Sequence, residues 1–424
     1  MPEQRGNVFD MLDPALKDSV ARNGILIPTE AQKLAIPEIL SGSNVLLISP
    51  TGSGKTEAAV LPVLNRIYTE RPQAIALLYI TPLRALNRDM LSRLIDYCNT
   101  LGMRVQVRHS DITQSQKNEI SKNPAQILIT TPESLQLLMM GKRLREHIKN
   151  IRYVIVDEVH EMAQNERGSQ FAIAMERLKV LAGNFQVIGL SATARNENEL
   201  ALFISPSKEC KILKPVIDKK MDIQVIMPEK SDEETAEIMA CDPQYAGSIQ
   251  RIHSIVEENT GTIVFVNRRY VAEDISFRMK LWLKNPDIEV HHGSLSKETR
   301  EKAESDFKEN RVKALICTSS LELGIDVGSA DMVVQFNSPR QINKMIQRIG
   351  RAGHSLEKIS RGMVICNDVI ELEHGITAIM VMAARGVGPE VASRILEVSY
   401  LHEEDLIKRL LNAETDFAKN RQYW

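Results

Sequence analysis

A glycine-rich stretch at residues 49–57, with the sequence SPTGSGKTE, constrains this chain more than any other feature. It follows an apolar run at residues 45–48 and precedes a segment of helical character that begins at Ala58. A strand that enters a glycine turn and continues as a helix directs backbone N–H groups and the positive end of the helix dipole at one point. Gly52 and Gly54 allow a close backbone approach that a Cβ would block. The stretch therefore predicts a site for a polyphosphate.

Within this loop we expect Lys55 to contact the β- and γ-phosphates and the Thr56 hydroxyl to bind Mg²⁺. The rest of the predicted cradle consists of Thr51, Gly52, Ser53 and Gly54. One position departs from the general pattern G-x-x-x-x-G-K-[ST], which has glycine where this chain has Ser49. The alternative is a glycine turn without function, which the buried strand directly before the loop disfavours.

Strand and helix signals alternate after the loop. Short apolar strands are predicted at residues 76–80, 105–107, 127–129, 154–156 and 187–190. This alternation indicates a parallel sheet with both faces covered by helices. Ligands gather at the carboxyl ends of the strands in such sheets, and a polar cluster follows each predicted strand.

Two acidic residues, Asp157 and Glu158, follow the strand at 154–156. Asp157 is placed to hold Mg²⁺, directly or through water, and Glu158 to orient and deprotonate an attacking water. The alternative is a solvated helix N-terminus.

Before the loop, residues 8–40 have helical spacing, and they include Gln32. A glutamine amide both donates and accepts, so Gln32 is a candidate reader of the adenine edge, although an exposed helical glutamine is the plainer alternative.

The pattern changes between about residues 205 and 260, where prolines and the charged run at 229–234 predict a surface connection between domains. A second strand series follows at residues 262–266, 288–290, 314–317, 332–336 and 363–366, without a phosphate loop. The expected domains are therefore 1–210 and 211–385, with a helical extension at 386–424.

The second series includes a stretch, QRIGRAGH at residues 347–354, that places Arg348 and Arg351 three apart on one face of a predicted helix. The planar fork of arginine is suited to bracing a γ-phosphate, and a salt-bridged helix is the alternative.

Composition bears on three further questions: nucleic-acid binding, metal sites and membrane location. The formal net charge of −2 gives no global attraction to polyanions, so a nucleic-acid contact would have to come from a local groove. Five isolated cysteines, never spaced C-x-x-C, predict reduced core thiols rather than a zinc site or an iron–sulfur cluster. No apolar run is long enough to span a bilayer, and no signal pattern opens the chain. We therefore expect a cytoplasmic protein without a membrane partner.

Taken in order, these motifs resemble those of the superfamily 2 helicases over nearly the whole chain. The D-E-V-H box at 157–160, the string at 347–354 and Cys366-Asn367-Asp368 are most similar to the large helicase-related (Lhr-like) family. The resemblance implies an α/β fold of two tandem RecA-like domains, each a parallel sheet with helices on both faces, and a short helical C-terminal extension. It implies a monomeric, ATP- and Mg²⁺-dependent helicase or translocase that acts on single-stranded or tailed duplex DNA or RNA.

The resemblance also assigns roles. It places Ser191 and Thr193 in the motif that couples hydrolysis to domain closure. It places four residues on the second domain's side of the ATP site: Asp326, Gln347, Arg348 and Arg351. It implies nucleic-acid contacts at Arg84, Thr130, Thr131, Asn267, Arg268, Arg269, His292, Gly293 and Thr318.

Two departures from the family pattern affect details. His354 stands where many relatives have a second finger-like arginine, so Arg351 would supply most of the transition-state charge and Arg348 would brace the interface. Only twenty residues separate Asp326 from Gln347, which leaves little room for a strand-splitting hairpin. An ATP-gated RNA or ribonucleoprotein clamp that does not unwind duplexes is therefore the principal alternative, and a P-loop kinase is a weaker one.

Overall fold

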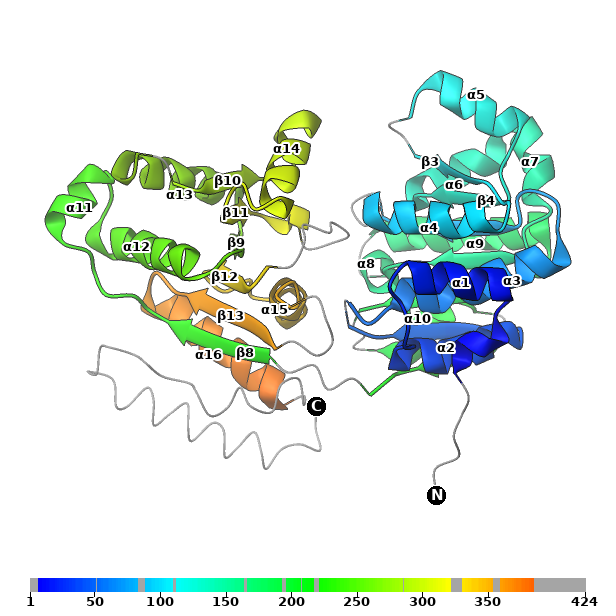
Figure 1. Cartoon of the computed structure of the whole chain (residues 1–424), viewed down its shortest axis with the longest axis horizontal. Helices are drawn as coiled ribbons and strands as arrows, with labels where there is room; N and C mark the ends of the chain where they lie inside the picture. Colours follow the sequence, from blue (N-terminus) through cyan, green and yellow to red (C-terminus); the bar gives the residue numbers. More distant parts are fainter. Residues whose placement is uncertain are drawn as a thin grey trace. The chain divides into compact units, whose positions relative to one another are not determined.

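The computed structural model describes residues 7–50, 52–82, 88–109, 112–163, 166–192, 196–206, 208–216, 221–284, 286–321, 330–353 and 359–384. They form two compact units (Figure 1): the first contains the described residues up to Val216, and the second those from Met221. The expected boundary at 210/211 falls a few residues earlier than this change, and the expected extension at 386–424 lies outside the described residues.

The first unit contains a seven-stranded parallel sheet in the order β3-β4-β2-β5-β6-β1-β7. Its strands are β1 (Asn44–Ile48), β2 (Leu77–Ile80), β3 (Val105–Arg108), β4 (Ile127–Thr130), β5 (Tyr153–Val156), β6 (Gln186–Ser191) and β7 (Cys210–Leu213). The strands predicted from apolar runs are confirmed. Strand β7 was not predicted, because it is a half-buried edge strand without a sustained apolar run.

Helices cover both faces of this sheet. One face packs against η1 (Val8–Met11), α1 (Pro14–Arg22), α2 (Glu30–Leu40), α3 (Lys55–Glu70) and α4 (Arg88–Thr100). The other packs against α5 (Gln114–Lys122), α6 (Pro132–Met140), α7 (Lys142–Ile148), α8 (Val159–Ala163), α9 (Glu166–Ala182) and α10 (Glu197–Ile204). Because side chains alternate along a strand, Leu47 joins the first core and Leu46 the second.

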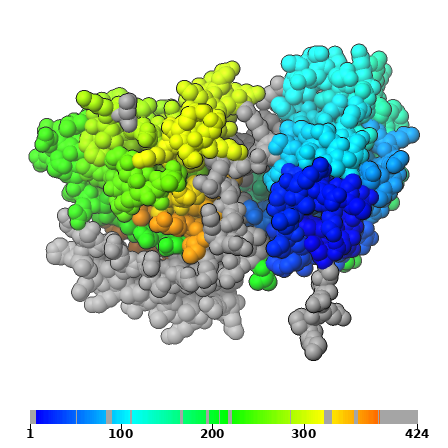
Figure 2. Space-filling view, in the orientation of Figure 1, coloured from blue at the N-terminus to red at the C-terminus, as the bar shows by residue number. Residues whose placement is uncertain are grey.

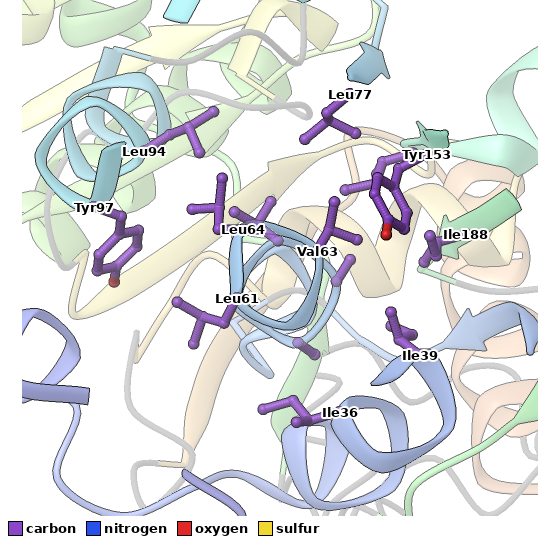
Figure 3. Close-up of a cluster of buried hydrophobic side chains, with 14 of the residues drawn as sticks. Ile36, Ile39, Leu61, Val63, Leu64, Leu77, Leu94, Tyr97, Tyr153 and Ile188 are labelled. Atoms are coloured by element: carbon purple, nitrogen blue, oxygen red, sulfur yellow. The ribbon is translucent and has the colours of Figure 1, made fainter. Parts of the chain in front are cut away.

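Helix α3, which follows the phosphate loop, lies at the centre of the first core. Figure 3 shows Leu61, Val63 and Leu64 of α3 surrounded by side chains from α2, α4 and the sheet. In the space-filling view the dark-blue and cyan atoms of α1 and α4 form the outer surface of this face (Figure 2). The helix that begins at Lys55 is therefore anchored by packing as far as Ile67.

The second unit contains a six-stranded parallel sheet in the order β10-β11-β9-β12-β13-β8. Its strands are β8 (Met221–Ile226), β9 (Thr262–Phe265), β10 (Ile288–His291), β11 (Ala314–Cys317), β12 (Met332–Phe336) and β13 (Ser360–Ile365). One face packs against α11 (Glu233–Ile238), α12 (Pro243–Glu258) and α13 (Arg269–Trp282). The described residues of this unit also form α14 (Lys297–Lys308), the short 3-10 helix η3 (Ser319–Leu321), α15 (Ile342–Ile349) and α16 (Val369–Ala384).

The stretch at residues 205–260 contains the change between the two units, but it is more than the predicted surface connection. This stretch supplies β7, β8, α11 and α12. Its prolines mislead because one of them, Pro243, begins α12 rather than interrupting it: Asp242 caps the helix by accepting from the Tyr245 N–H at 3.0 Å. Among the described residues, no helix is both long enough and apolar enough to cross a membrane.

Helix α12 approaches the loop between β8 and α11 so closely that it requires glycine at position 247. A Cβ there would lie 2.0 Å from the Glu229 carbonyl oxygen. Replacing a helical glycine by alanine ordinarily stabilises a helix by about 1 kcal/mol. For Gly247→Ala we expect the opposite sign, a loss of about 1–3 kcal/mol in unfolding free energy, because backbone has to move. Urea unfolding measures this change in free energy. Gly141→Ala is the control, since nothing lies within 4 Å of a Cβ at position 141. A stabilised Gly247→Ala variant would contradict this account.

Candidate nucleotide site and nucleic-acid face

The phosphate loop connects β1 to α3 and depends on two glycines in the left-handed region. Gly52 has a φ of 78° and Gly54 a φ of 76°, values that side chains disfavour. A Cβ on Gly54 would also lie 2.7 Å from the Gln32 Nε2 atom. The backbone conformation therefore favours glycine at 54, and a Cβ there would also have to displace the Gln32 side chain. Thr51 lies outside the described residues.

Lys55 and Ser49 close the loop on itself. Lys55 is buried, and its ammonium donates to the Ser49 carbonyl oxygen at 2.6 Å. The Ser49 hydroxyl donates to the Ser53 hydroxyl at 2.6 Å, a bond that a glycine at 49 could not make. The departure from the general pattern at position 49 therefore adds a side-chain contact across the loop.

Gln32 is buried against this loop rather than exposed on a helix. Its backbone N–H donates to the Thr29 hydroxyl at 3.3 Å, and its Oε1 accepts from the Thr29 N–H at 2.9 Å, which forms a capping box at the start of α2. The Thr29 hydroxyl donates to the Ser53 carbonyl at 2.7 Å. Since Oε1 already accepts one hydrogen bond, Nε2 is the group best placed for an adenine contact, which remains a prediction.

Asp157 follows β5 directly and is held by three hydrogen bonds. Its N–H donates to the Ile80 carbonyl at 2.8 Å, Oδ1 accepts from the Glu158 N–H at 2.9 Å, and Oδ2 accepts from the Tyr79 hydroxyl at 2.7 Å. Burial, and secondly the Glu158 charge, raise the pKa of Asp157 to about 6, while the Tyr79 bond and the Lys55 charge oppose this shift. A desolvated carboxylate of this kind is stabilised by a nearby cation.

Glu158 combines an unusual backbone with a buried oxygen. Its φ is 50°, a left-handed conformation that costs a non-glycine residue about 1–3 kcal/mol. Its Oε2 is buried and has no hydrogen-bond partner among the described residues, with the His160 Nδ1 atom at 3.5 Å. A carboxylate oxygen in this condition is suited to accept a hydrogen bond from a water.

Ser191 and His160 connect the acidic turn to the phosphate loop. The Ser191 hydroxyl lies 3.0 Å from His160 Nδ1, and the Ser191 carbonyl accepts from the Ser49 N–H at 2.9 Å. Burial lowers the pKa of His160 to about 4, so its imidazole is neutral at neutral pH. Thr193, predicted as the second coupling residue, lies outside the described residues.

Sequence reasoning missed Tyr79 and gave His160 no role of its own. The only signal for Tyr79 is a phenol within an otherwise aliphatic strand. His160 could have been proposed from its place in the D-E-V-H box.

In the second unit, Arg348 is buried and contacts three residues of the same unit. Its guanidinium donates to Asn267 Oδ1 at 3.1 Å and to Gln335 Oε1 at 2.7 Å, and it lies 5.2 Å from the centre of the Phe265 ring. These contacts tie α15 to β9 and β12. They favour a bracing role for this arginine.

The predicted helix contains Arg348 but ends before Arg351. Helix α15 ends at Ile349, and Arg351 lies in the following turn, where its N–H donates to the Arg348 carbonyl at 3.0 Å. Gly350, the C-cap, separates the two. Gln347 is buried in the last turn of α15, whereas Asp326 and His354 lie outside the described residues.

The predicted nucleic-acid contacts of the second unit gather at one edge of its sheet. They follow three adjacent strands: Asn267, Arg268 and Arg269 come after β9, His292 and Gly293 after β10, and Thr318 after β11. The Arg269 guanidinium donates to the Ser294 hydroxyl at 2.5 Å, which links the first two segments. A Cβ on Gly293 would meet nothing within 4 Å, so the surface there is open.

The predicted threonine contacts of the first unit are buried. The Thr130 hydroxyl donates to the Arg108 carbonyl at 2.9 Å, and Thr131 caps α6 by accepting from the Ser134 N–H. Since both hydroxyls serve the fold, a phosphate contact here would use backbone N–H groups at the start of α6. Arg84 lies outside the described residues.

Comparison with known proteins identifies the family. Residues 29–201 match the DEAD/DEAH box helicase family, and residues 247–355 match the helicase conserved C-terminal domain. The chain is 36% identical over 367 residues to the ATP-dependent helicase Lhr-Core of Methanothermobacter thermautotrophicus. The aligned region covers 80% of this chain and 42% of the relative. This chain belongs to the superfamily 2 helicases, in the Lhr-like family.

A second Lhr-like relative, the Lhr helicase/probable uracil glycosylase of Mycolicibacterium smegmatis, is 36% identical over 388 residues, 80% of this chain and 25% of the relative. A solved structure of Mycobacterium smegmatis helicase Lhr bound to ssDNA and AMP-PNP matches with a TM-score of 0.78 and 34% identity, over 89% of this chain and 51% of that chain. The predicted tandem RecA-like fold is confirmed. The chain spans about half or less of these helicases.

The packing of Gly54 against Gln32 gives a test of the loop. We expect Gly54→Ala to lower affinity for a nucleoside triphosphate analogue about tenfold or more, because the added Cβ strains the backbone and displaces Gln32. Gly102→Ala is the matched control, since Gly102 also has a positive φ, 66°, but nothing within 4 Å of a Cβ. Fluorescence titration with a labelled analogue measures both, and equal affinity in the two variants would refute the packing argument.

Proposed function

We propose that this chain is a nucleic-acid-dependent ATPase that couples ATP hydrolysis to movement along single-stranded DNA or RNA and to duplex unwinding. The observation that carries the proposal is the convergence of a phosphate loop, an acidic pair and Ser191 at the ends of three adjacent strands, β1, β5 and β6. The relative named an ATP-dependent helicase supports it, as does the helicase solved with ssDNA and AMP-PNP.

The residues of this edge fit ATP with Mg²⁺. The Thr56 hydroxyl and the Asp157 carboxylate would hold the ion, which neutralises phosphate charge when bound. The fit rests on Asp157, whose desolvated carboxylate gains from a cation. Among the described residues, no group of three or more Asp, Glu, His or Cys side chains is arranged to hold a metal ion by itself, and Mg²⁺ sites completed by water and phosphates do not need one.

Each group at this edge then has a role. Loop N–H groups from Thr51 to Gly54 bind the phosphates, Lys55 contacts the β- and γ-phosphates, and Gln32 contacts adenine. Glu158 accepts the proton of the attacking water through a carboxylate oxygen that has no protein donor among the described residues. Ser191 and Thr193 couple hydrolysis to conformational change, with the Ser191 bond to the phosphate-loop backbone in support.

Four residues of the second half complete the proposal. Arg351 stabilises charge on the transferring phosphoryl group, and Arg348 braces the segment that carries it. Asp326 and Gln347 contact the nucleotide. The network of Arg348 with Asn267 and Gln335 supports the division of labour between the two arginines, because a guanidinium bound to two amide oxygens is held in place.

Hydrolysis provides the first test. We expect Glu158→Gln to retain binding of ATP and of single strands but to lower steady-state turnover by about 10²–10⁴-fold, since an amide cannot take the proton. Glu146→Gln is the control, because Glu146 forms a surface ion pair with Lys149 at 2.7 Å. Unchanged turnover in Glu158→Gln would exclude it as the base.

The exposed edge of the second sheet provides the second test. Arg268 precedes α13 and Lys284 lies just after it, so the two exposed cations sit at opposite edges of the sheet. We expect Arg268→Ala to weaken binding of a single-stranded oligonucleotide and to reduce the slope of log affinity against log salt by about 1. Lys284→Ala removes the same charge and should leave the slope unchanged. Anisotropy titrations at several salt concentrations measure both variants. Equal slopes for Arg268→Ala and Lys284→Ala would contradict binding of the strand at this edge.

A strand-displacement assay on tailed DNA and RNA duplexes tests the coupling itself. Stimulated ATPase with displacement is the expected result. Stimulation without displacement would instead identify an ATP-gated clamp.

A further inference from the structure

Tyr79 is a buried phenol with one specific contact. It lies on β2 among Leu77, Leu78 and Ile80, its side chain is fully buried, and its hydroxyl donates to Asp157 Oδ2 at 2.7 Å. Strand β2 pairs with β5 so that Ile80 lies opposite Val156, the residue before Asp157. The register of two adjacent parallel strands therefore brings the phenol to the carboxylate.

Packing alone does not explain a hydroxyl at this position. The ring belongs to the first core, a place that phenylalanine or leucine would fill without a polar atom. A buried hydroxyl without a partner costs about 1–3 kcal/mol, so the Asp157 carboxylate is what makes tyrosine acceptable here. A phenol is protonated at neutral pH and can only donate to a carboxylate.

The two donors on Asp157 fix the orientation of its carboxylate and leave lone pairs on both oxygens available. The Glu158 N–H binds Oδ1 at 2.9 Å and the Tyr79 hydroxyl binds Oδ2 at 2.7 Å, so each oxygen has one donor. A carboxylate offers about four lone-pair sites, which leaves each oxygen one more for a cation or a cation-bound water. Rotation of the carboxylate would break at least one of the two bonds.

We propose that Tyr79 is a positioning residue for the nucleotide-bound metal: it holds the Asp157 carboxylate in the orientation that receives Mg²⁺. The inference rests on the proposed function, because it takes Asp157 as a Mg²⁺ ligand. Hydrogen bonds to ligating carboxylates ordinarily contribute about 10–100-fold in metal affinity. Tyr79 touches neither nucleotide nor metal in this role and acts only through Asp157.

The first unit supplies two matched controls. Tyr153 on β5 is also buried, and its hydroxyl also contacts a carboxylate, Glu70, at 3.1 Å from both oxygens, but it lies at the amino-terminal edge of the sheet. Tyr97 on α4 is buried too, and its hydroxyl has no hydrogen-bond partner among the described residues. Both appear in the core around α3 (Figure 3).

The experiment compares Tyr79→Phe, Tyr153→Phe and Tyr97→Phe in the full chain. A fluorescent ADP analogue is titrated in EDTA, and Mg²⁺ is then titrated at a fixed analogue concentration. For Tyr79→Phe we expect the half-saturating Mg²⁺ concentration to rise about 10–100-fold, with binding in EDTA unchanged, because the phosphate loop is intact. The two controls should match the wild type in both titrations.

A double-mutant cycle guards against an indirect effect. In an Asp157→Asn background, Tyr79→Phe should no longer change the Mg²⁺ titration, since the group through which it acts is altered. A Mg²⁺ effect that persists there overturns the proposal. So does a Tyr79→Phe variant that titrates like the wild type, or one whose affinity falls equally in EDTA and in Mg²⁺. If the wild type itself shows no Mg²⁺-dependent binding, the proposed function fails, and this inference with it.

Discussion

The candidate site depends on one hydrogen bond between neighbouring parallel strands, from the Ser49 N–H to the Ser191 carbonyl at 2.9 Å. This bond lies directly after the end of β1 at Ile48, and the glycine turn begins after it. Because β1 lies beside β6 and β6 beside β5, the same register sets the height of the acidic turn relative to the loop. Parallel strands end at a common edge, so the groups that we propose for binding phosphate, metal and water follow three neighbouring strands of one sheet.

Most polar groups at this edge are bonded to one another before any ligand arrives. The Lys55 ammonium donates to the Ser49 carbonyl, Asp157 accepts from the Tyr79 hydroxyl, and the Ser191 hydroxyl is hydrogen-bonded to His160. In a poorly solvated environment such bonds are strong and keep the groups in place. Glu158 differs, because its Oε2 has no hydrogen-bond partner in the described part of the chain and its backbone is strained. Strain and an unsatisfied acceptor in a single residue are what a group that must handle a reacting water would show.

The parts that sequence could predict are those encoded locally. The glycine loop, the acidic pair and the apolar strands each lie within a few residues, and all were found where expected. Strand β8 was missed because its residues alternate between buried and half-buried within a segment with several prolines. The contact of Tyr79 with Asp157 joins residues 78 positions apart, and that of Arg348 with Asn267 joins residues 81 apart. No local pattern encodes them, since they arise from strand order and register.

The two sheets share an architecture but use their carboxyl edges differently. In the first unit the edge after β1 consists of backbone N–H groups, small side chains and one lysine, which suits a compact polyphosphate. In the described residues of the second unit no glycine-rich loop follows a strand, and the edge after β9 has Asn267 bonded to the buried Arg348, with Arg268 exposed. Open space over Gly293 continues that edge across β10. An edge with dispersed cations and room for backbone suits a chain of phosphates rather than a cluster. A net charge of −2 does not argue against the proposed binding of a polyanion, because such a contact depends on local groups like Arg268 rather than on the total charge.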